Sequence, residues 1–317
     1  MEVAMHGAKT KLPRAEASWF PGANGSMVDL SYCKGKIRIT GFGRLYKGEE
    51  VDWSFRPFQK FEDGKKDLPS ARLLPDVVHA LGIKEKIFAP RPVFGTDMCY
   101  DHQLRERIPF EHGGKRVTLL RGASADIIMF APDETFAISV GGCPIGWIFD
   151  PQKPNRLIVG HMGLQCLIDR QLIVAGQKSR KHRSVIDRMW ESMNLLPREA
   201  ARIQAGYAFP IDPLHYVHQW DYPDGGDNNK RVCEYLAANF GNKCIVDWNN
   251  PETRKLGRIH LGNLIRSQYA ALGIPPENMH GASTPDAVDA DGHPLWYVTR
   301  GPHGKDPRNL VLVTLYQ

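Results

Sequence analysis

The chain has 317 residues, 42% of them hydrophobic and 24% charged, which is the composition of an ordinary globular protein with a sizeable core. The net charge of +6 is mild, and the densest basic run (178–183) precedes a predicted helix, so a solvated helix face is favoured over a nucleic-acid groove. The sequence shows no nucleic-acid-binding motif, no signal-peptide region and no apolar run long enough to cross a bilayer, and its six unpaired-looking cysteines indicate reduced thiols in a cytoplasmic protein.

The first third of the chain predicts a strand, a helix and a hairpin after an irregular arm. Residues 1–35 are rich in glycine, proline and polar groups, which predicts the arm, and Lys36–Phe42 alternates apolar and polar residues as a half-buried strand does. Pro75–Leu81 predicts a short helix, because proline suits its first turn and Gly82 suits its end. Three more segments are expected before residue 121: a strand (Ile87–Cys99), a surface loop or hairpin (Tyr100–Lys115) and a strand (Arg116–Leu120).

Residues 125–169 carry the clearest functional signal. Short apolar runs alternate here with turn residues, and two reactive side chains follow predicted strands: Cys143 comes after Phe136–Val140, and His161 after Leu157–Val159. A thiol and an imidazole at the ends of adjacent buried strands are held by a rigid scaffold, as catalytic groups usually are. The alternative interpretation is a buried structural cysteine and a histidine whose hydrogen bonds are satisfied.

The remaining segments predict mostly helices and a final strand. Residues 167–175 fit either a helix or a strand. The periodicity and flanking residues predict helices over Ser184–Leu196, Val232–Phe240 and Leu261–Leu272, a long aromatic connection over Ala205–Asp227, and a buried central strand over Asn309–Tyr316.

Cys143 and His161 suit two kinds of chemistry. The imidazole could activate the thiol as a nucleophile for hydrolysis or deamidation. The two side chains could instead bind a metal, but zinc needs at least a third protein ligand, and their separation fits no short zinc-finger pattern. Asp126 begins a predicted buried strand, and hydrogen bonding to a neighbouring loop is favoured over direct catalysis. Arg300 could bind an anionic substrate or form a surface ion pair.

Several motifs follow one another in the chain: Ala125-Asp126-Ile127, Val140-Gly-Gly-Cys143-Pro144, Asp150-Pro151, His161-Met-Gly163 and the helix at 259–269 with the following Gly-Ile-Pro-Pro turn. In this order they resemble the motifs of the bacterial laccase-domain ("polyphenol oxidase") family, and the resemblance covers about residues 50–317. The resemblance implies one α/β (α+β) domain, residues 36–317, with mixed sheets covered by helices in four layers, α/β/β/α. It also implies a small-molecule substrate, a purine nucleoside, that is cleaved by phosphorolysis (a transferase reaction) or hydrolysis, or is deaminated.

The resemblance also implies a zinc site with one altered ligand. The family's zinc ligands include a cysteine and a histidine that match Cys143 and His161, and a second histidine that matches Phe94 in Pro92-Val-Phe-Gly-Thr-Asp97. Phenylalanine cannot bind a metal, so zinc would need a replacement ligand, for which His102 and His112 are candidates. The implied catalytic residues are Cys143, His161 and Asp126, and the implied substrate-binding residues are Phe94, Thr96, Tyr297 and Arg300.

Three hypotheses follow. The protein is a divergent enzyme that acts on purine nucleosides with an altered metal shell, a catalytically inactive binding or structural protein on the same fold, or a metal-free hydrolase or deamidase that uses Cys143 and His161 as a dyad.

Overall fold

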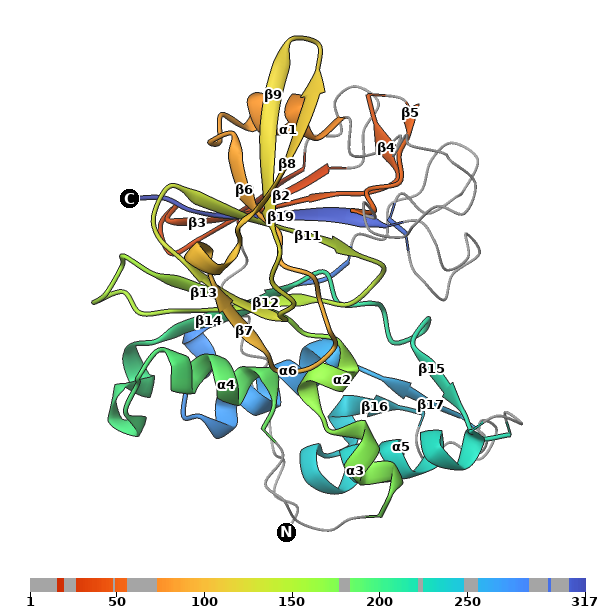
Figure 1. The fold of residues 1–317 in the computed structure, drawn as a ribbon. Coiled ribbons are helices and arrows are strands. Elements are labelled where there is room, and N and C mark those ends of the chain that lie inside the picture. The colour runs from red at the N-terminus through yellow and green to blue at the C-terminus, as the bar shows by residue number, and fades with distance from the viewer. Residues whose placement is uncertain are drawn as a thin grey trace.

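Two large β-sheets lie face to face in this structure, a computed structural model that describes residues 16–19, 27–47, 49–55, 73–176, 183–221, 225–247, 256–284, 296–297 and 308–317 (Figure 1). Helix α1 (Leu74–Leu81) covers the outer face of the first sheet, and the other α-helices cover the outer face of the second. The layers therefore run α/β/β/α, as the resemblance implied.

The first sheet has eight strands. Their order is β1 (Glu16–Trp19), β2 (Met27–Tyr32), β3 (Ile37–Phe42), β19 (Asn309–Leu315), β11 (Glu134–Val140), β6 (Lys86–Phe88), β9 (Lys115–Arg121) and β8 (Glu106–His112). The last strand of the chain, β19, lies between β3 and β11 and is buried throughout, which explains its continuous apolar sequence and confirms the predicted central strand.

The second sheet has six strands, and it carries the site. Their order is β18 (Met279–Ala282), β14 (Gln204–Ala208), β12 (Ile145–Phe149), β13 (Leu157–His161), β10 (Ile127–Phe130) and β7 (Met98–Tyr100). Two small sheets complete the strands: β15 (Val217–Gln219) with β17 (Leu256–Ile259) and β16 (Ile245–Val246), and β4 (Leu45–Tyr46) with β5 (Glu49–Glu50). The middle strands β12 and β13 are fully buried, because the first sheet covers one face and helices cover the other.

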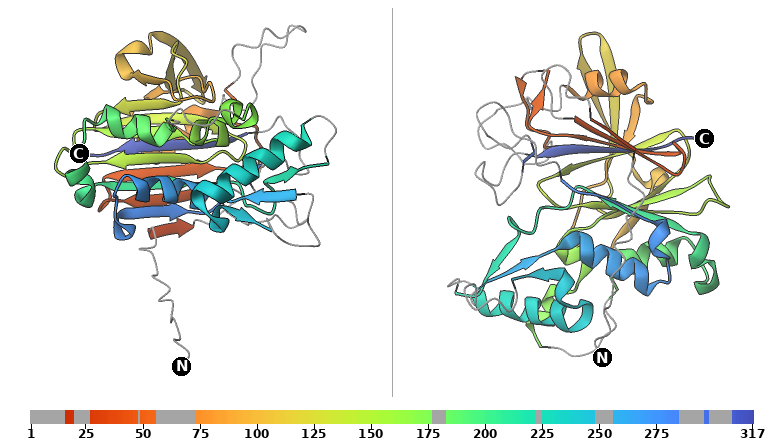
Figure 2. Two further views of the ribbon diagram at one scale, coloured as in Figure 1. Left: turned by 90° about the horizontal axis from the view of Figure 1, so that it is seen from below. Right: turned by 180° about the vertical axis from the view of Figure 1, so that it is seen from behind.

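The helices on the second sheet are α2 (Leu164–Leu167), α3 (Arg170–Val174), α4 (Val185–Ser192), α5 (Gly226–Phe240) and α6 (Leu261–Ala271). Figure 2 shows α4, α5 and α6 lying over this face of the molecule. Short 3₁₀ turns occur at Asp101–Gln103, Pro197–Arg202, Asn242–Cys244 and Pro276–Asn278. Among the residues that the structure describes, no helix combines the length and apolar character needed to cross a membrane.

A continuous apolar core joins the two sheets. Both sheets contribute almost completely buried side chains to it: Tyr32, Ile39, Phe136 and Val313 from the first, and Trp147, Phe149, Leu157 and Val159 from the second. A second core lies between the helices and the outer face of the second sheet. Because the first core belongs to neither sheet alone, the sheets depend on each other for stability.

Several helix ends follow their local sequence signals. Helix α1 has proline in its first turn and ends at Gly82, whose φ of 64° is readily adopted only by glycine. Helix α4 is capped by Ser184, which accepts a hydrogen bond from the backbone N–H of Asp187. These contacts confirm the predicted helix at Pro75–Leu81 and the start of the one predicted at Ser184–Leu196, which ends earlier, at Ser192. The strand β3 confirms the one predicted at Lys36–Phe42.

Four expectations need correction. Within the predicted irregular arm (1–35), residues 16–19 and 27–32 are strands of the first sheet, because β2 pairs along its whole length with β3; residues 1–15 lie outside the described part. The segment 87–99 is not one strand: β6 ends at Phe88, β7 begins at Met98, and a loop joins them. The expected connection 205–227 contains β14, an inner strand of the second sheet. The helix expected over Val232–Phe240 begins earlier, at Gly226.

Candidate functional site

The topology brings three strand ends together in the second sheet. Asp126 directly precedes β10, and His161 is the last residue of β13, the antiparallel neighbour of β10. The backbone N–H of His161 donates to the carbonyl of Asp126 at 2.8 Å. Cys143 lies in the link between β11 of the first sheet and β12 of the second, and Ile145, two residues later, pairs with His161. Three residues far apart in sequence therefore meet at one edge.

The imidazole of His161 has a different partner on each side. Its Nδ1 lies 3.0 Å from Oδ1 of Asp126, and both side chains are buried. A Cβ atom placed on Gly163 would come within 3.3 Å of Sγ of Cys143 and 3.4 Å of Nε2 of His161, so the thiol and the other ring nitrogen share the space above this glycine. Any larger residue at position 163 would crowd both groups. The order is thus carboxylate, imidazole, thiol.

Asp126 also holds the loop that carries Phe94. Its carboxylate accepts the backbone N–H groups of Val93 at 3.3 Å, Phe94 at 3.1 Å and Gly95 at 2.7 Å. This confirms the interpretation that Asp126 fixes a neighbouring loop by hydrogen bonds. Phe94 has a φ of 60°, an uncommon conformation for a bulky residue, and the three hydrogen bonds offset its cost.

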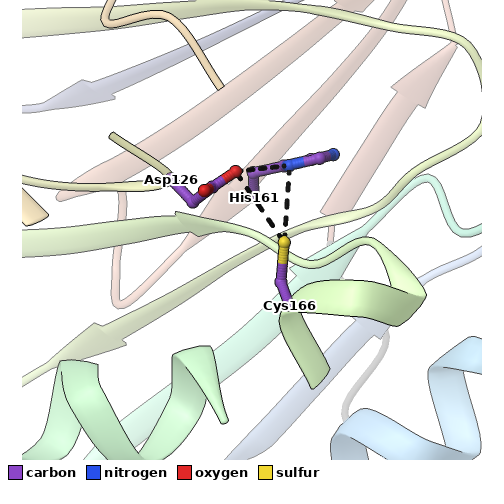
Figure 3. A group of neighbouring side chains, drawn as sticks. All are labelled: Asp126, His161 and Cys166. Atoms are coloured by element: carbon purple, nitrogen blue, oxygen red, sulfur yellow. Dashed lines mark hydrogen bonds and ion pairs between the residues drawn. The ribbon is translucent and has the colours of Figure 1, made fainter. Parts of the chain in front are cut away.

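Cys166, which sequence reasoning missed, completes the buried group (Figure 3). Its Sγ lies 3.7 Å from both Oδ1 of Asp126 and Nδ1 of His161. Cys166 comes five residues after His161, in the short helix α2 that follows β13. The sequence signal for this contact was a cysteine five residues after a strand-end histidine. That signal is weak, because cysteine is among the most commonly buried residues.

The electrostatics of the site favour a charged imidazole. Burial by itself lowers the pKa of His161. Its hydrogen bond to Asp126 is the largest opposing effect, and its interactions with Cys143 and Cys166 add to it, so that the pKa lies well above the ordinary histidine value. Burial raises the pKa of the Cys166 thiol, which stays protonated at neutral pH. Asp126 therefore favours the protonated form of His161, whose ring lies between this carboxylate and the Cys143 sulfur.

Phe94 packs against His161 and borders a hollow. The two ring centroids are 5.2 Å apart in an edge-to-face arrangement, and 54% of Phe94 is exposed. The hollow has a volume of about 800 Å³. Its walls come from the Phe94 loop, α2, α3 and α5, through Phe94, Gly95, Thr96, Gln165, Asp169, Arg170, Gln171, Leu172, Val174, Arg183 and Asn228. Thr96 therefore lies in the wall of a cavity whose edge is Phe94, the residue that packs against His161.

Tyr297 lies apart from this hollow. Its hydroxyl donates to Glu50 at 3.0 Å, and its backbone N–H donates to the side chain of Asn309 at 2.9 Å. Asn309 in turn donates to the carbonyl of Val140, at the end of the strand that leads to Cys143. Tyr297 thus supports that strand end. Arg300 lies outside the described residues.

The two candidate replacement ligands are directed elsewhere. His102 stacks on Tyr100 beyond the end of β7 that is remote from Asp126, and 71% of its side chain is exposed. His112 is at the tip of the β8–β9 hairpin, where its Nδ1 lies 3.3 Å from Asp76 of α1. In this structure neither histidine lies beside Cys143 and His161.

The residues present do not fit the zinc site that the fold family implies. Phe94 offers no donor atom beside Cys143 and Nε2 of His161, and two protein ligands retain zinc poorly. On the other side of the ring, Asp126, His161 and Cys166 offer three buried ligand atoms within 4.8 Å of one another, and this group could hold a metal ion. A metal there would compete with the proton that joins Nδ1 to Asp126.

Comparisons with known proteins identify the fold. No family model matches the chain, and no curated protein matches its sequence. Among solved structures, the hypothetical protein YfiH of Bacillus licheniformis is 16% identical, with a TM-score of 0.59 over 92% of this chain and 97% of that one. YlmD of Geobacillus stearothermophilus is 13% identical, with a TM-score of 0.58 over 96% of this chain and 100% of that one.

A third solved structure agrees with these two. It is a Neisseria meningitidis protein described as DUF152, which is 12% identical, with a TM-score of 0.56 over 90% of this chain and 96% of that one. At these identities the likeness establishes the fold, and it spans nearly the whole of each chain. The protein has the single-domain, mixed α/β fold of the YfiH-type laccase-domain proteins.

Proposed function

We propose that this protein is a metal-free hydrolytic enzyme in which Cys143 is the nucleophile, His161 the general acid and base, and Asp126 the group that orients His161. The observation that carries the proposal is the placement of His161, with Asp126 on Nδ1 and the Cys143 thiol beside Nε2. A thiol, an imidazole and a carboxylate in this order form the arrangement that activates cysteine nucleophiles on unrelated folds.

The substrate we propose is a purine nucleoside with an exocyclic amine, which is deaminated. The sequence resemblance to the laccase-domain family implies a small molecule of this class, and a hollow of about 800 Å³ with an exposed aromatic ring at its edge offers room for one. The flat face of a purine would stack on Phe94 close to His161.

The reaction balances without a cofactor. The Cys143 thiolate adds to the ring carbon that bears the amine, and His161 protonates the amine, which leaves as ammonia. A water molecule, deprotonated by His161, then attacks the same carbon and displaces the thiolate. The sum is substrate and water to the deaminated base and ammonia. The role of Asp126 is to keep the ring of His161 oriented and to stabilise its charge.

Selective alkylation tests the nucleophile. We expect iodoacetamide to modify Cys143 at pH 6–7, well below the range of an ordinary thiol near about 8.5, because a neighbouring imidazolium favours the thiolate. Cys33 is an internal control, since it is also half-buried and burial raises its pKa to about 12. Peptide mass spectrometry would locate the label, and His161→Gln and Asp126→Asn should each slow the labelling of Cys143 alone.

Turnover and metal content complete the test. Release of ammonia from adenosine by the wild type, and its loss in Cys143→Ala with an unchanged circular dichroism spectrum, are the expected results. Labelling of Cys143 that rises only above pH 8 would refute the activated nucleophile. Stoichiometric zinc that is lost in Cys143→Ala would support a metal-dependent enzyme instead. A normally folded protein that neither releases ammonia nor holds zinc would be a binding or structural protein.

A further inference from the structure

The walls of the hollow beside Phe94 are rich in hydrogen-bond donors. Among its lining residues are two guanidinium groups (Arg170 and Arg183), three side-chain amides (Gln165, Gln171 and Asn228) and one hydroxyl (Thr96). Among the described residues that line it, the only carboxylate belongs to Asp169, which accepts the backbone N–H of Leu172 at 3.0 Å as the cap of α3. A cavity with this inventory suits a ligand that is rich in acceptors and negatively charged.

Arg170 is held in place by a neutral partner. Its Nη2 donates to Oδ1 of Asn229 on α5 at 3.1 Å, and among the described residues it forms no ion pair within 4 Å. An amide partner orients the guanidinium group without neutralising its positive charge. Arg170, the first residue of α3, therefore places an oriented positive charge in the cavity wall.

Arg183 contributes the second cation, from the residue just before the N-cap of α4. Its Nη1 lies 3.4 Å from Oε2 of Glu191, and 67% of its side chain is exposed. Exposed pairs of this kind contribute little free energy, so a phosphate can replace the carboxylate as its partner at small cost. Arg183 also lines an adjoining hollow with Arg188 and Asp97.

The two arginines and Phe94, which packs against His161, line different parts of one cavity. Phe94 and Gln165 form the part next to His161 and Cys166, whereas Arg170 and Arg183 belong to α3 and to the start of α4. Resting on the proposed function, we infer that the substrate carries a phosphate on its sugar: the base lies against Phe94, and the phosphate is bound by Arg170 and Arg183. The preferred substrate class is then a purine nucleoside monophosphate, not the free nucleoside.

Calorimetric binding to the full-length Cys143→Ala variant tests this inference without turnover. The ligands are adenosine 5′-monophosphate, adenosine, ribose 5-phosphate and inorganic phosphate. We expect the monophosphate to bind about tenfold or more tightly than adenosine, because hydrogen bonds to charged groups contribute about that factor or more. When Arg170→Gln or Arg183→Gln is added to the Cys143→Ala variant, the ratio of the two affinities should fall about tenfold. Arg198→Gln, at an exposed arginine in the turn Pro197–Arg202, is the matched control and should leave it unchanged.

Each other outcome is decisive. Equal affinity for adenosine and its monophosphate, or a preference that neither arginine variant alters, would overturn the inference. Binding of inorganic phosphate as tightly as the monophosphate would indicate a separate phosphate co-substrate and also contradicts it. Arginine-dependent binding of ribose 5-phosphate without any contribution from the base would keep the anion site and remove the purine. Arginine-dependent binding of the monophosphate, together with an unreactive Cys143, would uphold the substrate class while refuting the proposed chemistry.

Discussion

His161 accounts for most of the chemistry that this site can perform, because its two ring nitrogens face different partners. With Nδ1–H directed at Asp126, Nε2 is the atom that faces Cys143. The same orientation would serve a metal ligand, since histidines that bind metals commonly donate their other N–H to a carboxylate. What separates the two interpretations at this scale is the residue at position 94, which here offers a hydrocarbon ring.

Phe94→His should therefore create a zinc site. Histidine adopts a φ near 60° more readily than phenylalanine, and its ring would add a third donor beside Cys143 and His161. We expect about one zinc per chain in the purified variant and substoichiometric zinc in the wild type, as measured by mass spectrometry of the metal.

The double variant Phe94→His/Cys143→Ala is the control and should lose the metal. Wild-type protein with a full equivalent of zinc that disappears in Cys166→Ala would contradict this expectation and would assign the metal to the buried group on the Nδ1 side.

At the scale of elements, the ends of strands are fixed by a few buried polar contacts. Asp150 directly follows β12 and accepts two hydrogen bonds from Arg202, at 3.0 Å from Nε and 2.8 Å from Nη2. Its side chain is fully buried, and the contact ties the central strand of the second sheet to the turn Pro197–Arg202. This is the opposite end of β12 from Cys143, so the strand is anchored behind the site.

Asp150→Asn should weaken the protein in a pH-dependent way. The hydrogen bonds from Arg202 hold the pKa of Asp150 below its ordinary value, so the ionised form stabilises the fold above about pH 4 and this contribution is lost as the pH falls through the lowered pKa. We expect the variant to lose about 2 kcal/mol of unfolding free energy at pH 7 and to show a flatter acid branch, both measured by urea unfolding between pH 2 and pH 7.

Asp133→Asn is the comparison for this variant, because Asp133 forms only a partly exposed pair with Lys84 at 3.7 Å. This variant should change the unfolding free energy by less than about 0.5 kcal/mol throughout the range from pH 2 to pH 7. If Asp150→Asn and Asp133→Asn changed the unfolding free energy equally, the buried contact with Arg202 would contribute no more than an exposed ion pair.

At the scale of the whole molecule, the shared core makes the two sheets a single cooperative unit. Phe149 on β12 is 1% exposed and belongs to the apolar group that includes residues of both sheets. Phe149→Ala should cost about 3–5 kcal/mol, because the cavity cannot collapse between two rigid sheets. Far-ultraviolet circular dichroism and tryptophan fluorescence should report the same shifted urea midpoint.

Val246→Ala, at an exposed position of β16, should leave that midpoint nearly unchanged. Two separate transitions in Phe149→Ala, one for each probe, would mean that the sheets unfold independently.

Local signals in the sequence were enough for those elements whose boundaries depend on neighbouring residues. Pro75 and Gly82 mark the ends of α1, Ser184 caps α4, and the apolar run at 309–315 could be buried only as a central strand. The positions of Cys143 and His161 at strand ends followed from the same kind of reasoning, and the fold class followed from the order of the motifs.

Other features depend on partners that are distant in the chain. Residues 27–32 form a strand because β3 pairs with them, and 204–208 form one because β12 and β18 lie on either side, although the sequence around them is rich in glycine, aromatic residues and proline. The contact of Cys166 with Asp126 and the cavity between α3 and the Phe94 loop also arise from packing. Short-range hydrogen bonds and periodicity depend on adjacent residues, so they can be predicted from a short stretch of sequence. Contacts between remote segments depend on how whole sheets and helices stack, so they cannot be predicted in this way.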